Sequence, residues 1–84
     1  MASQKRIDDL EAYCKGWAES CQHAAAHRDW LLDLQAQGVM IADPTSQNLL
    51  PELIAEADFR ALRNHRIKTY MESLRDRAIN GEDV

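Results

Sequence analysis

The segment SQKRIDDLEAYCKGWAESCQHAAAHRDWLLDLQAQ, residues 3–37, decides the fold, and it contains no proline. Its apolar side chains recur at alternating steps of three and four residues, which is typical of one face of an α-helix. We call this face the seam; it comprises Ile7, Leu10, Cys14, Trp17, Cys21, Ala24 and Leu31, with Arg28 at its one charged step. The pattern predicts one long helix over residues 3–37, with Ser3 as its N-cap.

A second, opposite stripe runs along the same segment at the same spacing. It comprises Gly16, Ser20, His23, His27, Trp30 and Leu34. A chain of 84 residues forms only a thin core, so the remainder of the chain is too short to cover both faces of this helix. We therefore predict that the seam packs inside the chain. The second stripe is predicted to contact another molecule, first of all a second copy in a homodimer, with Trp30 as an aromatic anchor.

The remainder of the chain predicts a loop followed by a helical arm. Gly38 is placed to end the first helix, and turn-forming residues then fill a loop over residues 38–49. Helices are predicted over residues 50–57 and 58–80, followed by a frayed tail at 81–84.

The break between these two predicted helices follows from their apolar faces. On a straight helix the face around Ile54 and the face around Met71 point about a quarter turn apart. A kink is therefore expected between Ala57 and His65, with Asp58 as the N-cap of the last helix. The predicted fold is all-α, a single domain over residues 1–84. A long N-terminal helix packs against a kinked C-terminal arm, giving about three helices that pair into a dimeric helical bundle.

Composition limits the classes of function. The chain carries a net charge of -4, which argues against nonspecific coating of nucleic acid or anionic membranes. No apolar run approaches the length needed to span a bilayer, so no membrane association is expected. Cys14 and Cys21 lie about 10 Å apart along the predicted helix, too far for a disulfide. Reduced cysteines favour a cytoplasmic location.

No catalytic, metal or cofactor motif is present. His23 and His27 have the four-residue spacing of a helical metal chelate, but Cys14 and Cys21 project from a different side of the helix. We therefore expect no metal site. The sequence has no Gly-rich phosphate loop and no nucleophile elbow, so we also expect no cofactor and no catalytic residue.

Arg28 is the anomalous residue of the seam, because an unpaired charge on a buried face is costly. Two interpretations remain open. Arg28 pairs with a carboxylate of the arm, Glu56 or Asp58, or it faces a partner or ligand.

The last third of the chain is locally basic. We call Arg60, Arg63, Arg66 and Lys68 the basic set; these residues are candidate contacts for an anion or for nucleic acid. Against this interpretation, the arginines spiral around the predicted helix, and Glu72 and Asp76 are close enough in sequence to neutralise part of the charge.

Together these patterns predict a small non-enzymatic module that regulates, adapts or inhibits by occupying the surface of a protein partner. Its size and acidic composition suit an accessory protein of a microbe or virus. The first alternative is a dimeric nucleic-acid-associated regulator that uses the basic C-terminal helix. The second is a small helical enzyme that clamps an anionic substrate between Arg28 and Arg63.

Overall fold

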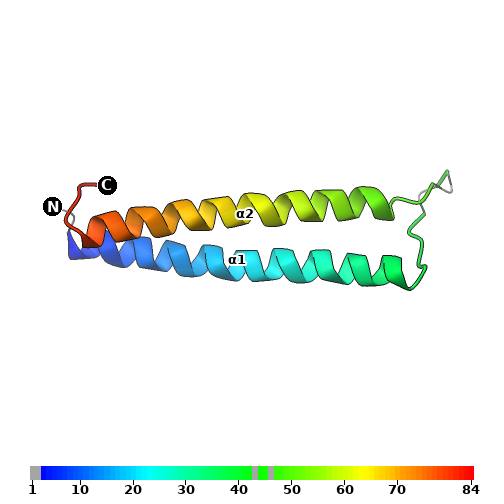
Figure 1. The fold of residues 1–84 in the computed structure, drawn as a ribbon, viewed down its shortest axis with the longest axis horizontal. Coiled ribbons are helices and arrows are strands. Elements are labelled where there is room, and N and C mark those ends of the chain that lie inside the picture. Colours follow the sequence, from blue (N-terminus) through cyan, green and yellow to red (C-terminus); the bar gives the residue numbers. More distant parts are fainter. Residues whose placement is uncertain (1–2, 43, 46) are drawn as a thin grey trace.

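The protein is a hairpin of two long α-helices in a computed structural model that describes residues 3–42, 44–45 and 47–84. Helix α1 spans Gln4–Ala36 and helix α2 spans Leu50–Ile79. The helices run antiparallel, so both chain termini lie at one end and the loop at the other (Figure 1). Within the described residues no strand forms, and one isolated bridge joins Ala42 to Asn48. The all-helical prediction is confirmed.

Local sequence signals cap the start of α1 and end both helices. The Ser3 hydroxyl accepts a hydrogen bond from the backbone N–H of Arg6 at 3.1 Å, which caps α1. At the other end of α1, Gly38 has a φ of 77°, and the N–H of Val39 donates to the carbonyl of Leu34 at 3.0 Å. Gly81, with a φ of 92°, ends α2 in the same way. Glycine adopts this left-handed conformation without the steric cost that a Cβ imposes.

Asn48 holds the start of α2 against the end of the loop. Its side-chain Oδ1 accepts hydrogen bonds from the N–H of Leu50 at 3.1 Å and from the N–H of Ile41 at 3.3 Å. The N–H of Leu49 also donates to the carbonyl of Ile41 at 2.8 Å. These bonds tie the two sides of the loop together at the point where α2 begins.

Helix α2 is continuous, and the break expected between Ala57 and His65 is absent. Asp58, expected to cap a separate helix, lies in the interior of α2. The face of α2 that packs on α1 follows a seven-residue repeat. Its members are Leu50, Ala57, Asn64, Met71 and Ala78, all buried except the half-buried Met71.

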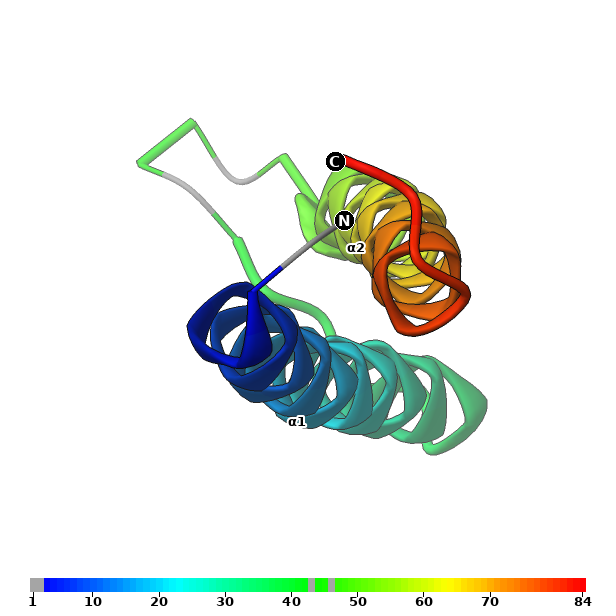
Figure 2. The same cartoon turned by 90° about the vertical axis from the view of Figure 1, so that its left-hand side faces the viewer.

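The seven-residue repeat explains why no kink is needed. On a straight helix such a repeat drifts by about 20° per heptad, so the line from Leu50 to Ala78 turns by roughly 80°. Two helices that wind around one another absorb this drift and keep the repeat facing the partner helix. In Figure 2 the two helices are visibly inclined to one another. The quarter turn inferred from the sequence therefore requires no kink, since α2 is continuous and its repeat stays on the face toward α1.

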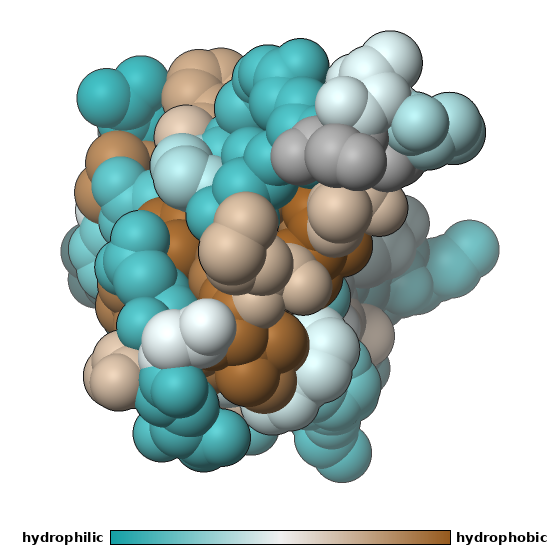
Figure 3. Space-filling view, turned by 90° about the vertical axis from the view of Figure 1, so that its right-hand side faces the viewer, coloured by the Kyte–Doolittle hydropathy of each residue, from teal (hydrophilic) through white to brown (hydrophobic). Residues whose placement is uncertain are grey.

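The seam of α1 packs against α2, as predicted. Leu10, Cys14, Ala24 and Leu31 are buried, and the other seam residues are half-buried. One buried cluster forms near the loop from Leu31, Leu50 and Ala57, with Leu34, Ile41, Leu53 and Ile54 packed against it. The loop end of the molecule shows apolar side chains at its centre with polar ones around them (Figure 3).

The hairpin is elongated and exposes more surface than a compact monomer of its mass. It measures 58 × 19 × 15 Å, with a radius of gyration of 18.3 Å. A compact chain of this length would have a radius of gyration of about 12 Å. The accessible surface is 5934 Å², whereas a monomer of 9.6 kDa typically exposes about 5,100 Å². Roughly 800 Å² of surface is thus in excess of what a compact fold would leave uncovered.

The last residues do not extend freely, although fraying was expected at 81–84. The Arg6 side chain donates through Nε to the carbonyl oxygen of Val84 at 3.1 Å. Arg77 forms an ion pair with Glu82 at 3.3 Å. The antiparallel fold brings the tail beside the start of α1, which a sequence pattern alone does not reveal.

Candidate interaction surface

The structure divides the second stripe into two groups. Gly16, His23, His27 and Trp30 are exposed, and 55% of Trp30 remains accessible. The other two members, Ser20 and Leu34, are half-buried and contact α2 or the core cluster. The stripe therefore borders the contact between the helices instead of lying wholly opposite to it.

Ser20 takes part in a polar contact between the two helices. Asn64 of α2 is buried, and its Nδ2 donates a hydrogen bond to the Ser20 hydroxyl at 3.1 Å. The Oδ1 atom of Asn64 is also buried and has no hydrogen-bond partner within the described part of the chain. An unsatisfied buried acceptor of this kind costs about 1 to 3 kcal/mol.

A shallow groove of about 310 Å³ lies on α1, in its N-terminal half. We call it the Gly16 groove; it is lined by Ala12, Tyr13, Gly16, Trp17 and Ser20. Four of these residues stand at positions i, i+3, i+4 and i+7, the spacing of the four residues that surround an inserted side chain in coiled-coil packing. The groove has the layout of a hole on a helix face.

Gly16 is unexplained by the hairpin itself. A Cβ atom added at Gly16 would meet nothing within 4 Å among the residues that the structure describes, so no contact with those residues requires a glycine there. A glycine in a helix interior costs about 1 kcal/mol relative to alanine. Its effect on this surface is to deepen the centre of the groove.

A second groove, of about 340 Å³, runs between the helices and brings the stripe next to the basic set. Ser20, His23 and His27 of α1 meet Arg60 and Asn64 of α2 there, together with Ala24. The His27 ring lies beside Trp30, with ring centroids 5.8 Å apart. Trp30 thus stands at the edge of a cluster that is aromatic on one side and basic on the other.

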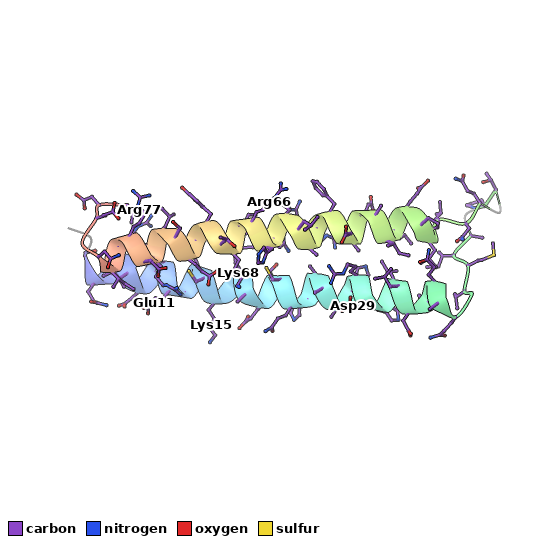
Figure 4. All side chains as sticks on the ribbon, viewed as in Figure 1. Glu11, Lys15, Asp29, Arg66, Lys68 and Arg77 are labelled. Atoms are coloured by element: carbon purple, nitrogen blue, oxygen red, sulfur yellow. The ribbon has the colours of Figure 1, made fainter. Side chains whose placement is uncertain are left out.

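The basic set does not form one surface. Lys68 is half-buried between the helices and forms an ion pair with Glu72 at 3.6 Å, whereas Arg66 projects from the outer side of α2 (Figure 4). Arg60 and Arg63 line another groove with Ala55, Glu56 and Phe59. Within the described part of the chain, no ion pair involves Arg60, Arg63 or Arg66.

Arg28 is less buried than its place in the seam predicts. Its side chain keeps 31% of its accessible surface and forms ion pairs with Asp29 at 3.4 Å and with Asp58 at 3.7 Å. Asp58 is one of the two carboxylates expected from the sequence. Arg28 and Arg63 line different grooves, so these grooves give no common clamp for one small anion.

Trp17 was expected in the core, yet it is only half-buried and also lines the Gly16 groove. The contact between two helices is flanked by solvent on both sides, so a large side chain on the seam reaches the exposed edge of that contact. Sequence reasoning missed Tyr13, 50% exposed, as a wall of the same groove. The signal that finds it is the spacing of Tyr13, Gly16, Trp17 and Ser20.

Both cysteines are free thiols. Burial raises the pKa of the Cys14 thiol, and the nearby Arg75 guanidinium opposes that shift. In the described ranges, no group of three or more His, Cys, Asp or Glu side chains is arranged to hold a metal ion. A search of the same residues finds no helix with the length and apolarity needed to cross a membrane.

Comparisons with protein-family models, with curated proteins and with solved structures gave no match to this chain.

Proposed function

We propose that this protein is a non-enzymatic protein-binding module that regulates, adapts or inhibits by covering part of a partner's surface. The observation that carries the proposal is the exposed stripe side of α1, where the Gly16 groove and the His27–Trp30 pair lie on one helix. Aromatic side chains beside a groove are typical of the residues that dominate binding energy in protein interfaces. The free thiols of Cys14 and Cys21 are in keeping with a reducing, cytoplasmic setting.

The energetics of the hairpin support the same proposal. A single layer of contact between two helices buries few large apolar residues, and Leu10 and Leu50 are the largest of those that are fully buried. Phe59, Leu62 and Tyr70 of α2 are each more than half exposed. A partner that covers such side chains adds apolar burial at about 25 cal/mol per Å² of area removed from water.

The arginines of α2 favour a second candidate, a dimeric nucleic-acid-associated regulator. Arg60 and Arg63 line one groove, and within the described residues neither forms an ion pair, so both are available for phosphates. The spiral arrangement of the basic set weakens this candidate. A protein helix that docks on a duplex contacts the phosphates through one of its sides, and these cations do not share one side of α2. We therefore rank it below protein binding.

Affinity capture from the native host separates the two candidates. The bait is the intact chain, and the variant is Trp30→Ala. Leu32→Ala is the matched control, because Leu32 is also an exposed apolar residue of α1, 41% accessible, but lies outside the second stripe. The proposal expects a defined protein retained by the wild type and by Leu32→Ala and lost with Trp30→Ala.

A salt titration of binding to random duplex DNA completes the experiment. Affinity that falls steeply with salt, and that is lost when Arg60 and Arg63 are replaced by Gln, would establish the nucleic-acid candidate in place of protein binding. No binding to duplex at low salt, with Trp30-dependent capture of a protein, supports the proposal.

A further inference from the structure

The Gly16 groove has the form of an unfilled hole, and the same helix presents a side chain suited to fill it. Gly16 and Trp30 stand 14 residues apart on the second stripe, about 21 Å along the helix axis. His23 lies midway between them, seven residues from each. Two copies of α1 crossing antiparallel at His23 would place each Gly16 level with Trp30 of the other copy.

We propose that the partner that fills the Gly16 groove is a second copy of this chain, docked antiparallel along α1, with Trp30 of each copy inserted beside Gly16 of the other. This inference rests on the proposed function and names its partner. A twofold axis at His23 places both Trp30 side chains beside both Gly16 residues in the same dimer. Neither groove is then left for a third copy, so the contact is closed. A closed arrangement gives dimers and not fibres.

Surface area favours a second copy. The excess of roughly 800 Å² over a compact monomer equals the share that each partner contributes to an interface of standard size, about 800 Å². Two hairpins packed side by side form a four-helix bundle, in which the stripe side becomes interior. The glycine that the monomer leaves unexplained then permits the close approach of the second helix.

The test is sedimentation equilibrium on the intact chain over a concentration series, with three variants. Gly16→Leu places a side chain in the groove, where the added Cβ atom would meet nothing within 4 Å among the described residues, and it replaces a poor helix former by a good one. We expect it to remain folded by circular dichroism and to dissociate at least about tenfold more readily. Trp30→Ala should weaken association by about 30-fold, the loss that corresponds to a hot-spot side chain. Gln22→Leu, an exposed change on another side of α1, should leave association unchanged.

Mixing Gly16→Leu with Trp30→Ala tests the register. The mixed dimer has one native contact between Trp30 and Gly16, and its other contact joins the two substituted side chains, a leucine and an alanine. It should therefore form more tightly than either variant dimer. Failure of the mixture to associate, with both variants folded, overturns the antiparallel register.

The wild-type chain tests the identity of the partner. A chain that sediments as a monomer at high concentration overturns the second copy as partner. In that case Trp30-dependent capture of another protein would still uphold the proposed function, so the two failures are distinguishable.

Discussion

The two halves of the hairpin follow the same seven-residue repeat but place different kinds of residue at its buried positions. The loop half, residues 24–36 and 50–61, contains the buried cluster of Leu31, Leu50 and Ala57. The terminal half, residues 4–20 and 64–79, places Lys68 and Arg75 at half-buried positions beside α1 and buries Asn64 with an unsatisfied oxygen. The Gly16 groove opens on this second half. The terminal half also buries Leu10, Cys14 and Ala78, but these residues are not part of the loop-half cluster. We therefore expect the loop half to be the more stable one, and the terminal half carries part of the proposed docking surface.

This contrast has a physical reason. Apolar burial stabilises folding without a specific partner, whereas polar groups at a contact stabilise it only when each finds its hydrogen bond or ion pair. A half whose polar groups lack some of their hydrogen bonds in the monomer gains more stability when a partner binds.

Leu50→Ala should destabilise the chain most, by about 3 kcal/mol, because Leu50 is 1% exposed at the centre of the loop-half cluster. Urea denaturation followed by circular dichroism measures this change. Leu62→Ala is the matched control in α2, since Leu62 is 53% exposed, and should shift the free energy of unfolding by less than about 0.5 kcal/mol. Equal effects of the two substitutions would show that the loop half is not the stable region.

Trp17→Ala should cost about 2 kcal/mol, less than the roughly 3 to 5 typical of a fully buried tryptophan, because Trp17 is half-buried in the terminal half. Denaturation at a low protein concentration, where association does not contribute, gives the monomer value. A loss as large as that of Leu50→Ala would contradict the ranking of the two halves.

Asn64→Leu should raise the free energy of unfolding by about 1 kcal/mol, since it removes an unsatisfied buried oxygen from the terminal half. Thermal unfolding of this variant and of Asn80→Leu, an exposed change just beyond α2, provides the comparison. Destabilisation by Asn64→Leu would mean that the Asn64–Ser20 contact outweighs the cost of the unpaired oxygen. The buried Asn64 would then stabilise the terminal half instead of weakening it.

Arg28→Met should have the smallest effect, under about 1 kcal/mol. The Arg28 and Asp58 side chains retain 31% and 55% of their accessible surface, so solvent screens their ion pair. If Arg28 were buried with its carboxylate on the seam, the same change would strand a buried charge at a cost of roughly 3 kcal/mol. Unfolding curves in low and high salt measure the loss of unfolding free energy caused by Arg28→Met. A loss near roughly 3 kcal/mol that does not depend on salt would show that the Arg28 charge is buried.

Several features follow from the sequence by itself because they depend on neighbours along the chain. Ser3 caps α1 through a hydrogen bond to Arg6, three residues away, and Gly38 and Gly81 end their helices through a left-handed φ. The seam could also be recognised in advance, since its period of three and four residues is the period of the helix. For the candidate site, the same periodicity predicts that Gly16, His27 and Trp30 lie along one stripe of the helix.

Only the tertiary structure decided the features that depend on where the second helix lies. Helix α2 runs without a break through Asp58. Its position beside α1 brings Asn64 within hydrogen-bond distance of Ser20 and leaves Trp17 half-buried at the edge of the contact. A sequence repeat gives the direction of a side chain relative to its own helix axis. It does not give the axis of the neighbouring helix, and burial is set by both.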